Sequence, residues 1–200
     1  MTKGTEDTGE TELYLVRHGE TEWSRSGRHT SVTDLPLTDT GRRQAEALFG
    51  HLRPADFGLV LSSPRLRAVE SARTAGFTGD HEPEICDDLV EWAYGDYEGL
   101  TSDEIREHDP DWDLWRNGCP GGESPSQVVG RLERLIGRIR ESGVERAIVF
   151  GHGHALRALT LCWLDLDLTV GERFPLQTAT VSILGWAKGE PALSRWNAPA

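Results

Sequence analysis

The sequence predicts an α/β fold built on a mostly parallel sheet, and two observations predict it. Short, nearly continuous apolar runs recur along the chain, as expected for strands that are covered on both faces. Amphipathic stretches with helix-capping residues lie between these runs, so strands and helices alternate. This alternation favours parallel strands that are joined by right-handed crossover helices.

Three apolar runs predict the central strands: "LYLVRH" at 13–18, "FGLVLSS" at 57–63 and "RAIVFGH" at 146–152. Each run is short enough for a strand and is bounded by polar or turn-forming residues. A fourth run, "TVSILGWA" at 180–187, predicts a further strand that could lie at an edge of the sheet. The spacing of the runs leaves room for a helix after each of the first three.

Four helices are predicted from amphipathic patterns and capping signals. Thr38 or Thr40 can cap the helix in "LTDTGRRQAEALFGHL". In "SSPRLRAVESARTAG", Ser63 is the expected N-cap and Pro64 the first helical residue. The clearest helix lies in "ESPSQVVGRLERLIGRIRESG", where a serine cap, a proline and a capping-box glutamine precede an apolar stripe. The fourth, "GHALRALTLCWL", follows the third strand.

The alternating pattern is interrupted at residues 91–123, which are rich in Trp, Asp and Gly. We expect an inserted helix and loops there, forming a lid or substrate wall within a single domain of residues 12–200. Residues 1–11 lack an apolar stretch and predict a flexible N-terminal tail without a secretory signal.

Composition and charge exclude several classes of function. The formal net charge of −12 argues against nucleic acids and acidic membranes as partners, because both need a basic surface. No apolar run approaches the roughly 20 residues that span a bilayer, and a cytoplasmic location is expected. The scattered cysteines Cys86, Cys119 and Cys162 predict neither disulfides nor a zinc site. The oligomeric state stays open, a homodimer included.

Two predicted strands end in the same dipeptide, His18-Gly19 and His152-Gly153. Ligands of parallel sheets bind at the carboxyl ends of the strands, so neighbouring strands would bring both imidazoles together. Glycines let backbone N–H groups approach an anion closely. Arg17 precedes His18, and the strand at 57–63 leads to two further arginines, Arg65 and Arg67. Histidines and arginines near helix N-termini predict a phosphate site.

Other interpretations of these residues are weaker. A histidine-glycine dipeptide by itself is usually a turn with a solvated histidine, but two such strand ends with nearby arginines make this unlikely to be the whole explanation. His18, His152, His154 and Glu91 could in principle bind a metal ion. The neighbouring arginines would repel a cation, so we expect no metal and no other cofactor.

The motifs that carry this pattern resemble the histidine phosphatase superfamily, which includes cofactor-dependent phosphoglycerate mutases. The resemblance runs through "LYLVRHGETEWS", "LSSPRLRAVESA", "LVEWAYGDYEGL" and "VFGHGHALRAL". It implies a three-layer α/β/α sandwich. It also implies that His18 is the nucleophile that takes up the phosphoryl group, that Arg17 and Arg67 clamp the phosphate, that His152 is the second pocket histidine and that Glu91 is the proton donor.

Departures from the mutase pattern favour hydrolysis. Ser24 stands where mutases usually carry asparagine, and "DLWRNGCPGGES" offers the single Arg116 where mutases have adjacent arginines. The chain is more similar to the branch of broad-range acid phosphatases and sedoheptulose bisphosphatases. That similarity implies a phosphomonoester hydrolase acting on small phosphorylated metabolites, among them sugar phosphates or bisphosphates. A sugar or distal phosphate would then be held by Arg116, with His29, Thr30 and Arg65 as further candidates. Ser24 and the backbone of Gly153 are also expected to bind the phosphate or the substrate.

Two alternatives stay open at this point. A phosphoglycerate mutase that depends on 2,3-bisphosphoglycerate would retain the phosphoryl group and return it to the substrate. A non-catalytic relative would bind phosphorylated ligands without turnover. The presence of Glu91 weighs against a pure binding module, because binding alone needs no proton donor.

Overall fold

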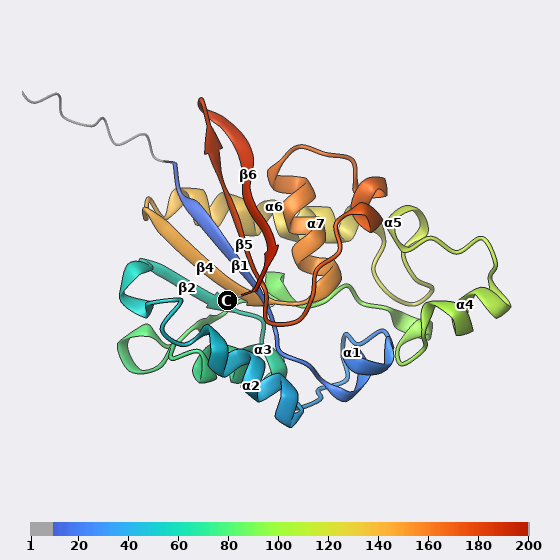
Figure 1. Cartoon of the computed structure of the whole chain (residues 1–200). Helices are drawn as coiled ribbons and strands as arrows, with labels where there is room; N and C mark the ends of the chain where they lie inside the picture. The colour runs from blue at the N-terminus through green and yellow to red at the C-terminus, as the bar shows by residue number, and fades with distance from the viewer. Residues whose placement is uncertain (1–9, 200) are drawn as a thin grey trace, which may run out of the picture.

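The computed structural model describes residues 10–199, which form a mixed sheet with the strand order β3-β2-β4-β1-β5-β6 (Figure 1). The strands are β1 (Glu12–Arg17), β2 (Leu59–Ser62), β3 (Glu84–Ile85), β4 (Arg146–Gly151), β5 (Val181–Ala187) and β6 (Glu190–Ala198). Strands β1, β2, β3 and β4 run parallel, and β5 and β6 are antiparallel to their neighbours. The mostly parallel sheet is therefore confirmed.

Strand β5 lies inside the sheet, so the suggested edge position of residues 180–187 is wrong. It pairs with β1 on one side and with β6 on the other. The turn between β5 and β6 contains Lys188 and Gly189, both with positive φ (57° and 81°), which suits a tight hairpin. Polar and apolar residues are interspersed in β6 (EPALSRWNA), and none of them is buried. The strand therefore has no continuous apolar run, and the sequence analysis did not predict it.

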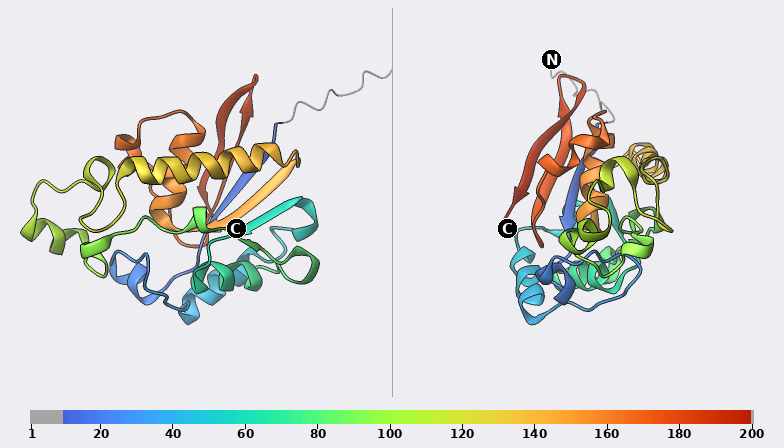
Figure 2. Two further views of the ribbon diagram at one scale, coloured as in Figure 1. Left: turned by 180° about the vertical axis from the view of Figure 1, so that it is seen from behind. Right: turned by 90° about the vertical axis from the view of Figure 1, so that its right-hand side faces the viewer.

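Helices cover both faces of the sheet and complete the three-layer α/β/α sandwich (Figure 2). The α-helices are α1 (Glu22–Ser26), α2 (Asp39–Leu48), α3 (Leu66–Thr74), α4 (Ser102–His108), α5 (Leu114–Asn117), α6 (Pro125–Glu141) and α7 (Gly153–Trp163). Short 3₁₀ helices span Pro54–Asp56, Gly79–His81, Asp87–Leu89, Gly95–Tyr97 and Leu168–Arg173. Helices α2 and α3 pack together on one face, and α6 and α7 pack together on the other.

The central strands bury side chains on both faces, which explains their continuous apolar runs. Leu13 and Leu15 of β1 join the core under α6 and α7, whereas Val16 joins the core under α2 and α3. Strand β4 alternates in the same way, with Val149 in the first core and Phe150 in the second. A strand buried on both sides has no polar face for solvent.

The predicted N-caps are confirmed for two helices, and the prediction is wrong for a third. Ser124 caps α6 with a complete capping box, and Thr38 caps α2. Ser63 does not cap α3, which begins at Leu66 after the N-cap Arg65. The Ser63 hydroxyl instead lies 2.7 Å from Nε2 of His152, so a contact to β4's end competes with the local capping role.

The predicted excursion at 91–123 contains α4 and α5 and lies beside the carboxyl ends of the strands (Figure 1). Its aromatic side chains Tyr94, Trp112 and Trp115 are buried in the same core as α6 and α7. The segment also lines the cavity described below, through Glu91, Tyr94 and Ser102.

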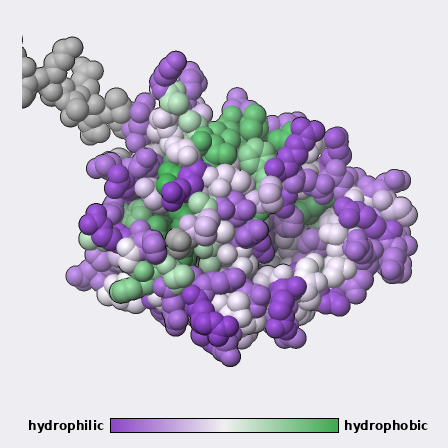
Figure 3. Space-filling view, in the orientation of Figure 1, coloured by the Kyte–Doolittle hydropathy of each residue, from purple (hydrophilic) through white to green (hydrophobic). Residues whose placement is uncertain are grey.

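The surface is mostly polar. On the face shown in Figure 3, hydrophilic residues predominate and hydrophobic residues gather only in small patches. Between residues 10 and 199, no helix is both long enough and apolar enough to span a membrane. Most of the tail expected at residues 1–11 lies outside the described residues, although Thr11 is buried and its hydroxyl donates to the Val144 carbonyl.

Candidate active site

The two histidines meet at the carboxyl ends of neighbouring strands. Strands β1 and β4 are parallel and pair Arg17 with Gly151, so His18 and His152 follow side by side. Their ring centroids are 5.2 Å apart at an interplanar angle of 62°. The convergence expected from two His-Gly strand ends is therefore a direct consequence of the sheet order.

His18 presents an unprotonated nitrogen to the cavity. Its Nδ1 lies 2.7 Å from the carbonyl oxygen of Gly19, and because a carbonyl can only accept, Nδ1 carries the proton. Burial lowers the pKa of His18 well below its usual value, and the charges of Arg67 and Arg17 lower it further. At neutral pH the ring is uncharged, and the Nε2 lone pair is free for attack on an electrophile.

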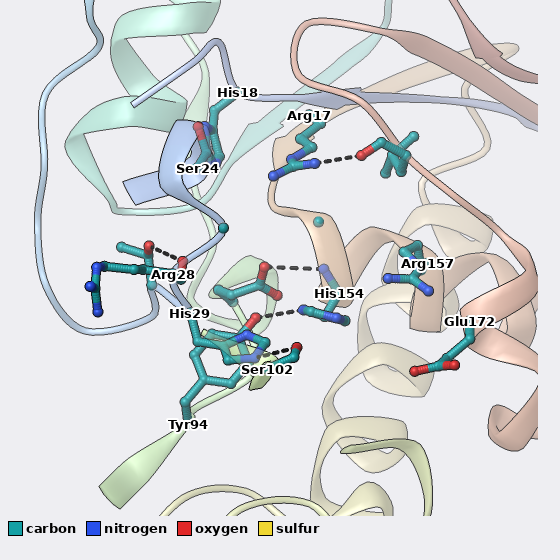
Figure 4. Close-up of a pocket in the computed structure, with 15 residues that line it drawn as sticks. Arg17, His18, Ser24, Arg28, His29, Tyr94, Ser102, His154, Arg157 and Glu172 are labelled. Carbon is teal, nitrogen blue, oxygen red and sulfur yellow. Dashed lines mark hydrogen bonds between the residues drawn. The ribbon is translucent and has the colours of Figure 1, made fainter. Parts of the chain in front are cut away.

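A cavity of about 320 Å³ opens at this end of the sheet (Figure 4). Of the residues predicted from the sequence, those that line it are Arg17, His18, Ser24, His29, Thr30, Glu91 and Gly153. Four others do not line it, and these are Arg65, Arg67, Arg116 and His152. Figure 4 shows Arg17 and His18 toward one end of the cavity and Tyr94 and Ser102 toward the other.

Arg17 is a half-buried cation with spare donor capacity. One terminal nitrogen donates to the carbonyl of Leu176, and Nε has no partner within the described part of the chain. Gly153 permits the approach of this guanidinium, because a Cβ at that position would lie 3.3 Å from Cζ of Arg17. A buried N–H group without a partner beside a cavity favours an anionic ligand.

Arg67 and His152 form a layer behind His18, and neither side chain is exposed. Arg67 donates from Nε to Nδ1 of His152 at 3.2 Å, and its terminal nitrogens donate to carbonyls of residues 30, 31 and 33. His152 Nε2 therefore carries the proton and donates to the Ser63 hydroxyl. Burial, followed by the charge of Arg67, lowers the pKa of His152 well below its usual value.

The other two predicted arginines lie outside the cavity. Arg65 precedes α3, and its Nε is buried without a partner in residues 10–199. The charge of Arg65 contributes to lowering the pKa of His152, but its effect is smaller than that of burial and of the charges of Arg67, His18 and Arg17. Arg116 lies on α5 with its side chain 65% exposed and forms an ion pair with Asp113 at 3.3 Å.

Glu91 is held by three backbone N–H groups. Its Oε1 accepts from Ala155 at 2.7 Å and from Trp92 at 2.9 Å, and its Oε2 accepts from His154 at 3.1 Å. Two of these donors belong to the first turn of α7, where the helix dipole favours a negative charge. The carboxyl group is 6% exposed and faces the same cavity as His18.

The far wall of the cavity carries neutral polar groups. Of these, only His29 was predicted from the sequence as a substrate-binding residue. The Tyr94 hydroxyl lies 2.6 Å from Nδ1 of His154, and His29 Nε2 lies 3.3 Å from the Ser102 hydroxyl. Burial is the main cause that lowers the pKa of His154 well below its usual value and that of His29 to about 4. Burial also raises the pKa of Tyr94 well above its usual value. These groups form hydrogen bonds without net charge.

Two cationic side chains beside this wall were also missed. Arg157 of α7 stacks on Trp115, with Cζ 4.7 Å from the ring centroid, and donates to the Gly171 carbonyl. Arg28 pairs with Glu104 at 3.0 Å. One signal could have revealed Arg157: it lies three residues after His154 on the predicted helix, and residues at that spacing share a face.

The match to the histidine phosphatase superfamily (branch 1) extends over residues 13–199. The chain belongs to this superfamily. It is 45% identical over 181 residues to an acid phosphatase of Mycobacterium tuberculosis, covering 88% of this chain and 87% of that protein. It is 38% identical to sedoheptulose 1,7-bisphosphatase of Saccharomyces cerevisiae, covering 77% and 68%.

Solved structures agree with this assignment. The product of the open reading frame Rv3214 of Mycobacterium tuberculosis superposes with a TM-score of 0.88 at 41% identity, covering 94% of this chain and 98% of that one. The predicted fold and superfamily are confirmed, and so is the prediction of a hydrolase. This histidine phosphatase is an enzyme that hydrolyses phosphate esters, and its family acts through a phosphohistidine intermediate.

The histidine phosphatase carries no arrangement of three or more His, Cys, Asp or Glu side chains suited to a metal ion, as far as residues 10–199 are concerned. The positive charge at the His18 end of the cavity comes from Arg17, with Arg67 behind it. Such guanidinium groups can stabilise the charge of a transferring phosphoryl group.

The buried neutral histidines predict destabilisation in acid. An unfolded histidine binds a proton near pH 6.5, whereas His29 in the folded enzyme does so at about pH 4, so stability is lost as the pH falls below 6.5. At pH 5 this difference amounts to about 2 kcal/mol for His29 alone. Urea unfolding at pH 7 and pH 5 should show the loss, and a His29→Asn variant should show a smaller one. Equal pH dependence in the two proteins would contradict the assignment to His29.

Proposed function

We propose that this histidine phosphatase hydrolyses small phosphomonoesters through a phosphohistidine on His18, and that the organic part of its substrate carries hydroxyl groups. The observation that carries the proposal is the meeting of three groups on one cavity. These are the free Nε2 of His18, the partly unpaired guanidinium of Arg17 and the carboxyl group of Glu91. They supply a nucleophile, a phosphate anchor and a proton donor.

The first step transfers the phosphoryl group to the enzyme. The Nε2 lone pair of His18 forms a bond to phosphorus, and the ester P–O bond breaks onto the leaving oxygen. Glu91 acts as the general acid of this step and gives a proton to that oxygen, so the alcohol departs neutral. The hydrogen bond from Nδ1 to the Gly19 carbonyl stabilises the positive charge that develops on the imidazole.

The second step releases phosphate. The Glu91 carboxylate takes a proton from water as the water oxygen bonds to phosphorus. The N–P bond breaks and returns its electron pair to His18 Nε2, which restores the resting enzyme. Arg17 and the Gly153 end of α7 face the charge of the transferring group in both steps, and Arg67 acts on this charge from behind His18. Arg67 is included because its charge already acts on the pKa of His18.

The cavity wall supports a polyhydroxylated substrate such as a sugar phosphate. His29, Tyr94, Ser102 and His154 offer uncharged hydrogen-bonding groups, which suit hydroxyls better than hydrocarbon. Arg157 and Arg28 beside them suit a second anionic group at the far end of a bisphosphate. The names of two relatives, an acid phosphatase and a sedoheptulose 1,7-bisphosphatase, support the same substrate class.

A panel of phosphate esters scored for phosphate release tests this proposal. It should contain sugar monophosphates and bisphosphates, 3-phosphoglycerate with and without 2,3-bisphosphoglycerate, and p-nitrophenyl phosphate, all in EDTA. We expect phosphate release with a preference for sugar phosphates. Isomerisation of 3-phosphoglycerate that depends on 2,3-bisphosphoglycerate would identify a mutase, and tight phosphate binding without turnover would identify a binding protein.

Arg157 is expected to select for bisphosphates. Arg157→Met should raise the KM of a sugar bisphosphate about tenfold or more, because a desolvated charged hydrogen bond contributes 1.5–3 kcal/mol in general. The KM of p-nitrophenyl phosphate should change little, since that ester has no second anion. Arg116→Met is the matched control, because Arg116 is exposed and lies outside the cavity. If Arg116→Met raised the KM of the bisphosphate more than Arg157→Met does, the second phosphate would have to bind near α5 instead.

A further inference from the structure

Besides the groups that face the cavity, the enzyme contains a buried ion pair between Glu123 and Arg131. Arg131 of α6 is only 6% exposed. Its Nε donates to Glu123 Oε1 at 2.8 Å and its Nη2 to Glu123 Oε2 at 3.1 Å, which makes the pair bidentate. Neither residue lines the cavity, and the catalytic steps described above use neither of them.

We infer that this ion pair is a positioning device that holds Glu91 in line with the leaving oxygen, an inference that rests on the proposed proton-donor role of Glu91. The pair grips the backbone on both sides of Glu91. Arg131 Nη1 donates to the carbonyl of Asp88 at 2.8 Å, and Glu123 Oε2 accepts from the backbone N–H of Ala93 at 2.9 Å.

The segment that carries Glu91 needs such support, because residues 90–94 form no helix and no strand of the sheet. Glu123 supplies part of its hydrogen bonding instead. Glu123 N–H donates to the carbonyl of Ala93 at 2.9 Å, and the carbonyl of Glu123 accepts from the Trp92 indole at 2.9 Å. The ion pair thus ties this irregular segment to the long helix α6.

The "PGGES" motif lets the two segments lie backbone to backbone. A Cβ at Gly122 would stand 2.1 Å from the Ala93 carbonyl oxygen, and one at Gly95 would stand 2.1 Å from the Pro120 carbonyl oxygen. Any larger residue at these two positions would push the segments apart. The motif therefore places Glu123 directly beneath the segment that it holds.

Geometry rather than net stability explains why an ion pair occupies this position. A buried ion pair generally adds little net stability compared with apolar residues of the same volume. Apolar side chains could not satisfy the Ala93 N–H or the Asp88 carbonyl, however, and both backbone groups would lose their partners. The gain is a fixed location for Glu91, whose carboxyl group must meet the first turn of α7 and the substrate at once.

Leaving-group selectivity separates a positioning role from a structural one. An alkoxide leaves only with a proton, whereas p-nitrophenolate leaves without one. A misplaced proton donor therefore slows an alkyl phosphate more than p-nitrophenyl phosphate. The ratio of kcat/KM for glycerol 2-phosphate to that for p-nitrophenyl phosphate reports this difference. The fraction of folded enzyme cancels in the ratio, so partial unfolding of a variant does not disturb it.

We expect Glu91→Gln to lower this ratio by about 100-fold or more, and Glu123→Gln and Arg131→Met to lower it by about tenfold to 100-fold. Arg134→Met is the matched control, because Arg134 lies one turn further along α6 and its exposed side chain binds the Asp88 carboxylate at 2.7 Å, not the Asp88 carbonyl. Its ratio should equal that of the wild type. Glu123→Gln conserves side-chain volume and keeps the test available where Arg131→Met fails to fold.

Two results would overturn the inference, and they are distinguishable. A low ratio in Glu91→Gln with wild-type ratios in Glu123→Gln and Arg131→Met would make the ion pair purely structural and leave the proton donor in place. A wild-type ratio in Glu91→Gln itself would show that Glu91 is not the proton donor, and the ion pair could then have no role in positioning one. The expected pattern is a low ratio in all three variants and a wild-type ratio in Arg134→Met.

Discussion

His18→Ala should abolish the phosphoenzyme and reduce turnover of every phosphate ester by at least about 1000-fold, which is the largest effect expected of any single substitution. The imidazole is the nucleophile in the first half of the proposed cycle and the leaving group in the second, and no other group of the site replaces its Nε2 lone pair. His152, the nearest histidine, uses both ring nitrogens in hydrogen bonds to Arg67 and Ser63. Its ring therefore has no free lone pair to take over the attack.

Rapid quenching with a ³²P-labelled ester measures this intermediate directly. The wild-type protein should carry an acid-labile, base-stable label, as expected of a phosphoramidate, and His18→Ala should carry none. His51→Ala is the control, because His51 is exposed and distant in sequence from every predicted strand end. Wild-type labelling in His18→Ala would refute the assignment of the nucleophile.

Arg17→Met should be the second most damaging substitution, with an expected loss of about 100- to 1000-fold in kcat/KM. Arg17 is half-buried, and its buried Nε–H group has no partner in residues 10–199, so the guanidinium can donate to the phosphoryl group. Its position is also fixed, because the Leu176 carbonyl holds one terminal nitrogen. Removal would leave the transferring group without its nearest positive charge.

Arg17→Lys tests whether charge alone is enough. Lysine offers a point charge on a flexible stem and cannot donate to Leu176 and to a phosphate oxygen from one rigid plane. We therefore expect Arg17→Lys to recover only a small part of the activity. Arg43→Met on α2, an exposed arginine, should match the wild type. Full activity in Arg17→Lys would show that a positive charge is enough and that the geometry of the guanidinium hydrogen bonds does not matter.

Much of the site could be predicted because the local sequence shows where each buried strand ends. The buried strands appear as apolar runs, and each run stops where polar residues begin, which marks the ligand-binding edge of a parallel sheet. Arg17, His18 and Gly153 needed no further information to be placed at this edge. Glu91 came from the family resemblance, since nothing in the pattern of residues 91–123 indicates that its carboxyl group meets α7.

The substrate end of the cavity was less predictable. Arg116 and Arg157 are both arginines in plausible positions, but only Arg157 lines the cavity. The difference depends on where α5 and α7 lie relative to each other, which is a long-range property. Likewise, the contact of Ser63 with His152 overrides a local capping signal, because the two residues are 89 positions apart in the sequence and meet only across the sheet.

By itself, the sequence determined the alternation of strands and helices and the superfamily, and it predicted the residues of the phosphate end, because periodicity, caps and strand-end motifs are local features. Only the tertiary structure decided the strand order, the interior position of β5, the neutral wall of the cavity and the support of Glu91 by Glu123 and Arg131. These features depend on contacts between residues far apart in the chain. Which of these long-range contacts form depends on packing and hydrogen bonding in the assembled core, and these are not visible in any short stretch of sequence.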